Sequence, residues 1–193
     1  MKKWTFIPLL ALIFTACQSE KTEEGQEKTF FPVLSYLNSQ VAHVDTSLYC
    51  IVKITTVGDK SDTVYLKREE FRKAAADFLS IPDITKKHLK RDYQETEIYD
   101  ESMESVILSY MPTDEDAEIR RQEVIIQPRQ AETDQVKSIF IDRVVEKGDA
   151  VIRKNMLWQI DRRFQVVTIT QNNDGTEKIE KLQVIWNDYP SAE

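Results

Sequence analysis

The stretch VIRKNMLWQIDRRFQVVTIT, residues 151–170, decides the fold because apolar and polar side chains alternate through both of its halves. Alternation with a period of two is typical of a β-strand that buries one face. Met156, Trp158 and Ile160 share one face of the first half, and Phe164 begins the corresponding face of the second. The stretch therefore predicts two antiparallel strands joined by a short link.

The length of this link sets the register of the two strands. A three-residue link over 161–163 would pair Ile160 with Phe164 and Trp158 with Val166. A two-residue link would oppose the same apolar side chains to polar ones. Because a slip of one residue turns every side chain to the other face of the sheet, we expect the longer link. No glycine is present there to indicate the turn type.

The same two-residue period extends outward on both sides of this hairpin. Short turn-rich or charged segments separate the further strand candidates, which are 96–99, 103–110, 119–126, 136–145 and 179–186. Consecutive strands with short links usually pair with each other, so we expect an antiparallel meander. Nearer the N-terminus, 48–57 and 62–66 predict a separate hairpin around the turn 58–61.

Helical spacing of apolar residues appears only before the meander. It predicts a helix over about 31–43 and a second over 67–80. Pro82 ends the second helix, and a short basic helix follows over about 84–91, for which we expect a solvated face rather than a phosphate site. Its basic side chains are Lys86, Lys87, His88, Lys90 and Arg91.

The strands carry apolar residues on their second faces as well. In 136–145, for example, the face of Phe140 and that of Ile141 are both apolar. A sheet with one solvated face alternates cleanly, so these strands should be packed on both faces or curled around a helix. The expected fold class is α+β, with N-terminal helices packed on a curved antiparallel β-meander, for which a half-barrel is one form.

Length and composition fit one soluble domain after a leader. The chain has 193 residues, of which 41% are hydrophobic and 31% charged, with a net charge of −7. This charge argues against a nucleic-acid partner, which needs a basic face. We expect a signal segment over 1–16, a tether over 17–29 and a single α+β domain over 30–193.

The first seventeen residues carry the clearest signal in the chain. Lys2 and Lys3 precede an apolar stretch over 4–14, which is too short for a transmembrane helix. Small residues then precede Cys17 in the sequence Phe-Thr-Ala-Cys. This order resembles the lipobox of bacterial lipoprotein precursors. The resemblance implies that the thiol of Cys17 is acylated, with palmitate among the acyl chains, and that cleavage leaves Cys17 as the new N-terminus.

The resemblance also implies a location in the cell envelope. The protein would be held on a membrane by its lipid, on the periplasmic or surface face of the outer membrane, without any amphipathic membrane helix. Loss of Lys2 and Lys3 leaves 24 Lys and Arg against 33 Asp and Glu, a net charge of −9 that disfavours adhesion to anionic lipid. Residues 18–28 hold no apolar side chain and predict a solvated tether, although an acidic stretch there also resembles a surface-export signal.

No catalytic, metal or cofactor motif is present. The chain lacks a Gly-rich phosphate loop, a nucleophile elbow and paired Cys or His motifs. Cys50 lies within a predicted strand, where we expect a buried, unreactive thiol. The acidic run 114–118 lacks the spacing of a calcium loop, and the carboxylates of 95–104 would be divided between the two faces of a strand. We therefore assign no catalytic residue, no metal ligand and no cofactor, and enzyme activity is not expected.

Three functions stay open from the sequence. The first is a non-catalytic envelope lipoprotein that binds a partner protein or supports an assembly. The second is a carrier of a hydrophobic ligand such as a lipid in a half-barrel cavity, and the third, with less support, is a hydrolase of envelope polymer. The aromatic residues suit either a core or a sugar- or peptide-binding groove; they are Tyr93, Tyr99, Tyr110, Trp158, Trp186 and Tyr189.

Overall fold

The computed structural model describes residues 29–129 and 133–188, and within them the chain forms an open antiparallel sheet with a few helices. The predicted signal segment 1–16, Cys17, nearly all of the tether and Tyr189 lie outside the described residues. The helices are α1 (Val33–Thr46), α2 (Arg68–Ala74), α3 (Ala76–Leu79) and α4 (Lys87–Lys90). The strands are β1 (Ile51–Val57), β2 (Lys60–Leu66), β3 (Tyr93–Asp100), β4 (Ser105–Pro112), β5 (Ile119–Gln127), β6 (Gln135–Lys147), β7 (Ala150–Gln159), β8 (Arg163–Asn172) and β9 (Glu177–Ile185).

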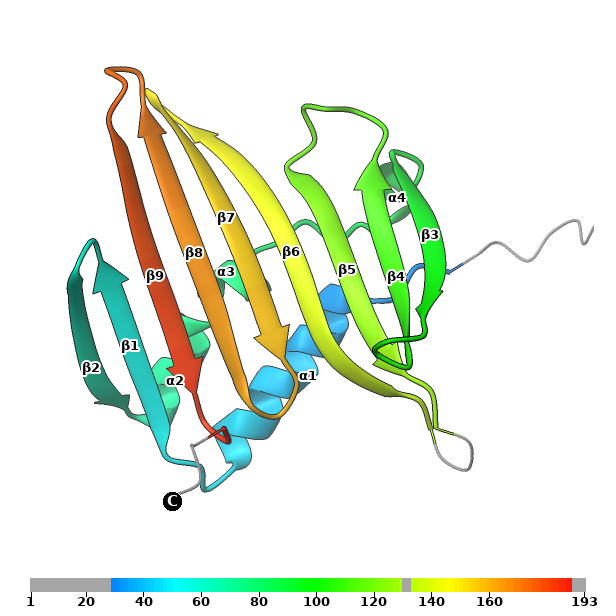
Figure 1. Ribbon diagram of the computed structural model, residues 1–193, viewed down its shortest axis with the longest axis horizontal. Helices are drawn as coiled ribbons and strands as arrows, with labels where there is room; N and C mark the ends of the chain where they lie inside the picture. The colour runs from blue at the N-terminus through cyan, green and yellow to red at the C-terminus, as the bar shows by residue number, and fades with distance from the viewer. Residues whose placement is uncertain (1–28, 130–132, 189–193) are drawn as a thin grey trace, which may run out of the picture.

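All nine strands belong to one sheet with the order β2-β1-β9-β8-β7-β6-β5-β4-β3. Figure 1 shows the sheet with β2 at one edge and β3 at the other, so it does not close into a barrel. From β3 to β9 each strand pairs with the next, which confirms the predicted meander. The N-terminal hairpin joins it through β1 and β9, a long-range pairing that local sequence does not indicate.

The link between β7 and β8 has the predicted length but a different position. It comprises Ile160, Asp161 and Arg162, so Trp158 pairs with Phe164 rather than with Val166. The predicted register was therefore wrong by two residues, although a shift of two keeps the same side chains on the same face. Asp161 has a φ of 57° and takes the left-handed position that glycine usually occupies in such links.

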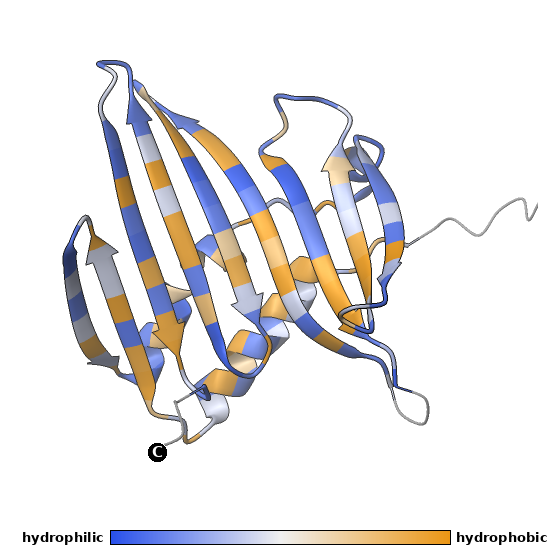
Figure 2. Cartoon of the chain, viewed as in Figure 1, coloured by the Kyte–Doolittle hydropathy of each residue, from blue (hydrophilic) through white to orange (hydrophobic). Residues whose placement is uncertain are grey.

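Side chains of α2, α3 and the central strands meet in an aromatic cluster. The rings of Trp158 and Phe164 stack with centroids 5.0 Å apart, and both are fully buried. Phe71 of α2 contacts Trp186 at 5.2 Å and Phe78 of α3 contacts Trp158 at 5.1 Å. Figure 2 shows the alternation of apolar and polar residues along these strands that supplies the cluster. Of the two roles that the sequence leaves open for the aromatic residues, Trp158 and Trp186 take the one in the core.

A β-bulge explains why β6 buries residues at both odd and even positions. Ile125 of β5 pairs with Ser138, and the next residue, Ile126, pairs with Val136, which leaves Lys137 as an extra residue. The extra residue changes which positions face the core. Val136 and Ile139 are consequently both buried, although positions three residues apart in a regular strand face opposite sides of the sheet.

Three local predictions need correction. The helix predicted over 67–80 is divided at Ala75, a fully buried residue whose ψ of 4° ends α2 before α3 begins. The basic helix is shorter than predicted and covers only Lys87–Lys90. Cys50 precedes β1 and is exposed, because Ile51 takes the buried position at the start of that strand.

Tyr110 ties the first described residues to the sheet. Its hydroxyl oxygen accepts a hydrogen bond from the N–H of Phe31 at 2.9 Å, and its O–H donates to Glu95 Oε1 at 3.0 Å. Burial, reinforced by the negative charge of Glu95, raises the pKa of Tyr110 far above its usual value of 10.0. The neutral hydroxyl is therefore built into the fold.

We predict that Tyr110→Phe reduces the alkaline loss of stability. Above about pH 10 the unfolded tyrosine ionises while the folded one stays neutral, so the unfolding free energy falls as pH rises through this range. The variant lacks this group and should lose less, although Tyr93, whose pKa is also raised, leaves a residual loss. Urea unfolding at several pH values from about pH 8 to about pH 11 measures the fall in the unfolding free energy of each variant. Tyr65→Phe, at a side chain 77% exposed, is the control; equal alkaline loss in the Tyr110 variant and the parent would contradict the prediction.

Candidate binding notch

The sheet opens between β5 and β6 because the two strands differ in length. The last ladder pair at this end joins Ile119 of β5 to Arg143 of β6, and β6 continues to Lys147 beside β7 alone. The connection 113–118 between β4 and β5 rises beside the unpaired part of β6, as Figure 1 shows. We call the space between this connection and residues 143–147 the notch.

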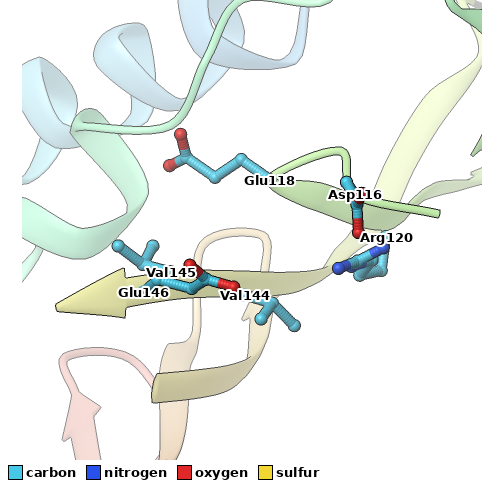
Figure 3. Close-up of a pocket in the computed structure, with 6 residues that line it drawn as sticks. All are labelled: Asp116, Glu118, Arg120, Val144, Val145 and Glu146. Atoms are coloured by element: carbon cyan, nitrogen blue, oxygen red, sulfur yellow. The ribbon is translucent and has the colours of Figure 1, made fainter. Parts of the chain in front are cut away.

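Two adjoining hollows make up the notch. The first, of about 420 Å³, is drawn in Figure 3 with its lining residues Asp116, Glu118, Arg120, Val144, Val145 and Glu146. The second, of about 660 Å³, continues toward the end of β4 and is lined by Met111, Pro112, Asp114, Glu115, Asp116, Arg120, Val144 and Arg153. Asp116, Arg120 and Val144 belong to both hollows, so the notch is one continuous surface depression.

A hydrogen-bonded ion pair fixes the base of the notch. Arg143 donates from Nε to Glu118 Oε1 at 2.6 Å, and its Nη2 lies 2.5 Å from the same oxygen. A further N–H of Arg143 donates to Ser80 Oγ at 3.0 Å, just after α3. The Arg143 side chain is only 14% exposed and that of Glu118 is 38% exposed, so water and salt screen this pair in part. The contacts connect β5, β6 and the end of α3 at one point.

The backbone of β6 presents unpaired positions to the notch. In an antiparallel sheet the N–H and C=O groups of successive residues point alternately toward the two neighbouring strands. The N–H of Val144 donates to the carbonyl oxygen of Glu118 at 2.8 Å, on the β5 side. The backbone groups of Glu146, two residues further on, therefore point to the same side, where β5 is no longer present. A strand placed there would extend the ladder.

Acidic side chains dominate the lining of the notch. Five carboxylates face two arginines across the two hollows. One of the arginines, Arg153, is held on Asp142 by two hydrogen bonds, at 3.0 and 2.5 Å, which raise the pKa of its guanidinium. An excess of negative charge beside an open strand edge suits a basic, extended peptide.

The notch offers binding groups rather than reactive ones. None of its lining residues is a Ser, Cys, His or Lys that would act as a nucleophile or base beside the carboxylates. In 29–129 and 133–188, no three His, Cys, Asp or Glu residues are grouped to hold a metal ion. The arrangement can hydrogen-bond a backbone, bury small apolar side chains on Val144 and Val145, and pair with positive charge.

The residues singled out from the sequence do not gather at this notch. Trp158, Trp186 and Tyr110 are fully buried in the core and line no groove, whereas Tyr99 is 56% exposed on the edge strand β3. Of the acidic runs, only 114–118 contributes, as one wall of the notch. The lipidation residue Cys17 lies outside the described residues.

The notch itself was missed by sequence reasoning, although one signal for it was available. The predicted strands 119–126 and 136–145 have nearly equal lengths, but β6 has 13 residues against 9 in β5. Apolar alternation is continuous into Val144 and Val145, whereas a charged segment precedes Ile119. Since the apolar pattern of β6 extends further than that of β5 at this end of the sheet, the sequence indicates that the end of β6 lies without a partner on the β5 side.

Comparison with known protein families, curated proteins and solved structures found no match to this chain. Among the helices in 29–129 and 133–188, none is long and apolar enough to cross a membrane.

We predict that Arg143→Met loosens the notch without unfolding the domain. The variant keeps an apolar stem but leaves Glu118 without its partner, so stability should fall by about 1–3 kcal/mol. Hydrogen exchange of the Val144 amide should accelerate more than that of amides in β8. Arg68→Met, at an exposed position on α2, is the matched control. An unchanged rate of hydrogen exchange at the Val144 amide in Arg143→Met would argue against the ion pair as the contact that fixes the base of the notch.

Proposed function

We propose that the protein is a membrane-anchored envelope lipoprotein whose domain binds a partner protein without catalysis. The observation that carries the binding role is the notch, where an open strand edge lies among acidic side chains. The Met1–Cys17 pattern supports the anchor, with acylated Cys17 on the periplasmic or surface face of the outer membrane.

The proposed architecture is a helix layer on the hollow side of a curved sheet, in the manner of a half-barrel. The contacts of Phe71 and Phe78 with Trp158 and Phe164 support it. In this arrangement aromatic side chains fill the space that a carrier would keep for a lipid. Recognition at the surface of the domain therefore has better support than an internal ligand.

The proposed partner segment is extended and basic. Its backbone would pair with Glu146 and extend the sheet between β6 and the connection 113–118. Main-chain hydrogen bonds would supply affinity, and contacts with Val144 and Val145 would select small apolar side chains at alternate positions. The carboxylates, among them Asp116, would favour Lys or Arg beside them.

We predict that growing cells incorporate a palmitate probe into the protein and that Cys17→Ser abolishes this label. The serine cannot form the thioether that holds the acyl chains, so the variant should also wash out of the membrane fraction. Gel fluorescence after probe conjugation measures the label. Cys50→Ser removes the exposed cysteine near β1 and is the matched control, which should keep the full label. A wild-type protein without label would remove the anchor from the proposal.

We predict that a photoreactive residue in place of Glu146 crosslinks to one discrete partner in intact envelopes. The same residue at Lys181, exposed on β9 between β1 and β8, should give no such product. Charge reversal by Asp116→Lys together with Glu115→Lys should reduce the yield about tenfold, which corresponds to about 1.4 kcal/mol of lost affinity.

Two outcomes would count against the notch as the binding site. The first is the same crosslinked products from the Glu146 and Lys181 positions, and the second is a yield at Glu146 that the charge reversals leave unchanged. Mass spectrometry of the crosslinked peptide then shows whether the captured segment is basic.

A further inference from the structure

A compact basic surface surrounds α4. Within six residues the chain carries four Lys or Arg side chains and one histidine, which are Lys86, Lys87, His88, Lys90 and Arg91. All but Lys90 are exposed, and Lys90 is partly buried. The nearest acids in sequence are Asp83, whose carboxylate accepts hydrogen bonds from Thr85, and Asp92, whose carboxylate lies 3.4 Å from Arg91. Within the described residues, Lys86, Lys87 and Lys90 form no ion pair with an acidic side chain. We call this set the α4 surface.

The α4 surface lies where the described chain begins. Lys90 Nζ is 5.4 Å from the centre of the Phe30 ring, and the ring of Phe30 packs on Tyr110 at 4.8 Å. Figure 1 shows the first described residues, which precede α1, beside β3 and β4. Eleven residues separate Cys17 from Thr29, which limits the distance between them to roughly 40 Å.

The charge of this surface contrasts with that of the rest of the protein. From Cys17 onward the chain has a net charge of −9, and without the four Lys and Arg of the α4 surface the remainder carries −13. An anionic membrane would repel most of the domain and attract this one end. Both effects favour a single orientation, with α4 toward the lipid.

We infer that the α4 surface docks the domain on the anionic headgroups of the bilayer that holds the lipid anchor. The inference rests on the proposed acylation of Cys17, since the acyl chains bring the chain entry at Phe30 close to the membrane. One lipid signal combined with a basic patch is a common basis for stable, oriented attachment. Each Lys or Arg near an anionic surface strengthens binding about fivefold.

The first experiment measures docking without the acyl chains. The fragment 18–193 contains the complete described core, because every buried apolar residue lies between Phe30 and Trp186. It should float with vesicles that contain phosphatidylglycerol and should not float with pure phosphatidylcholine. Binding should be lost at about 0.5 M salt, where the Debye length falls to a few Å.

Matched charge-neutral variants test the surface directly. Lys86→Gln, Lys87→Gln and Arg91→Gln together should weaken vesicle binding about 100-fold at three charges of about fivefold each. The control combines Lys60→Gln, Lys67→Gln and Arg68→Gln, three exposed positions near the opposite edge of the sheet. It removes the same net charge and should leave vesicle binding within about twofold of that of the parent fragment. Equal loss in both triple variants, or no binding of the parent to anionic vesicles, would overturn the inference.

A second experiment uses the acylated protein in proteoliposomes. Amine acetylation should modify Lys86 and Lys87 at least fivefold more slowly in phosphatidylglycerol membranes than in phosphatidylcholine, while Lys60 reacts equally in both. Equal rates at Lys86 in both membranes would contradict docking. Vesicle binding by 18–193 does not require acylation, so an absent palmitate label with intact vesicle binding would remove the anchor alone, and the reverse result would remove the docking alone.

Discussion

The rest of the structure depends on the burial of the stacked pair Trp158 and Phe164. The pair joins β7 to β8 and receives Phe71 and Phe78 from the helices, so one cluster fixes strand register and helix position together. A one-residue slip of β8 against β7 would turn Phe164 to the outer face and break its stack with Trp158. This penalty is large enough for Asp161 to adopt a positive φ in a link without glycine.

The elements that sequence predicts well are those whose pattern is local. The meander, the helix α1 and the hairpin of β1 and β2 follow from alternation, helical spacing and the Gly58 turn. The pairing of β1 with β9 and the break at Ala75 depend on residues far away in the chain. Alanine is a strong helix former, so only tertiary packing accounts for that break.

The candidate site was hidden from sequence for a related reason. No residue of the notch has an unusual chemistry. Its character arises because β6 extends beyond β5 and because the register shifts between Ile119 and Arg121, beside the notch. Strand ends are the least well determined part of any periodic pattern, because fraying and charge dilute it. The end of β6 in the notch stays open to pairing. At the edge strand β3, by contrast, acidic side chains discourage unspecific pairing with another strand.

The notch and the α4 surface are connected through one short stretch of backbone. The N–H and the hydroxyl of Thr113, at the start of the notch wall, both donate to the carbonyl oxygen of Asp92, which follows α4. Contact of α4 with lipid would therefore hold the connection 113–118 at the membrane as well. A basic segment bound in the notch would lie near anionic headgroups, which attract the same positive charges, so membrane and notch favour the same partner.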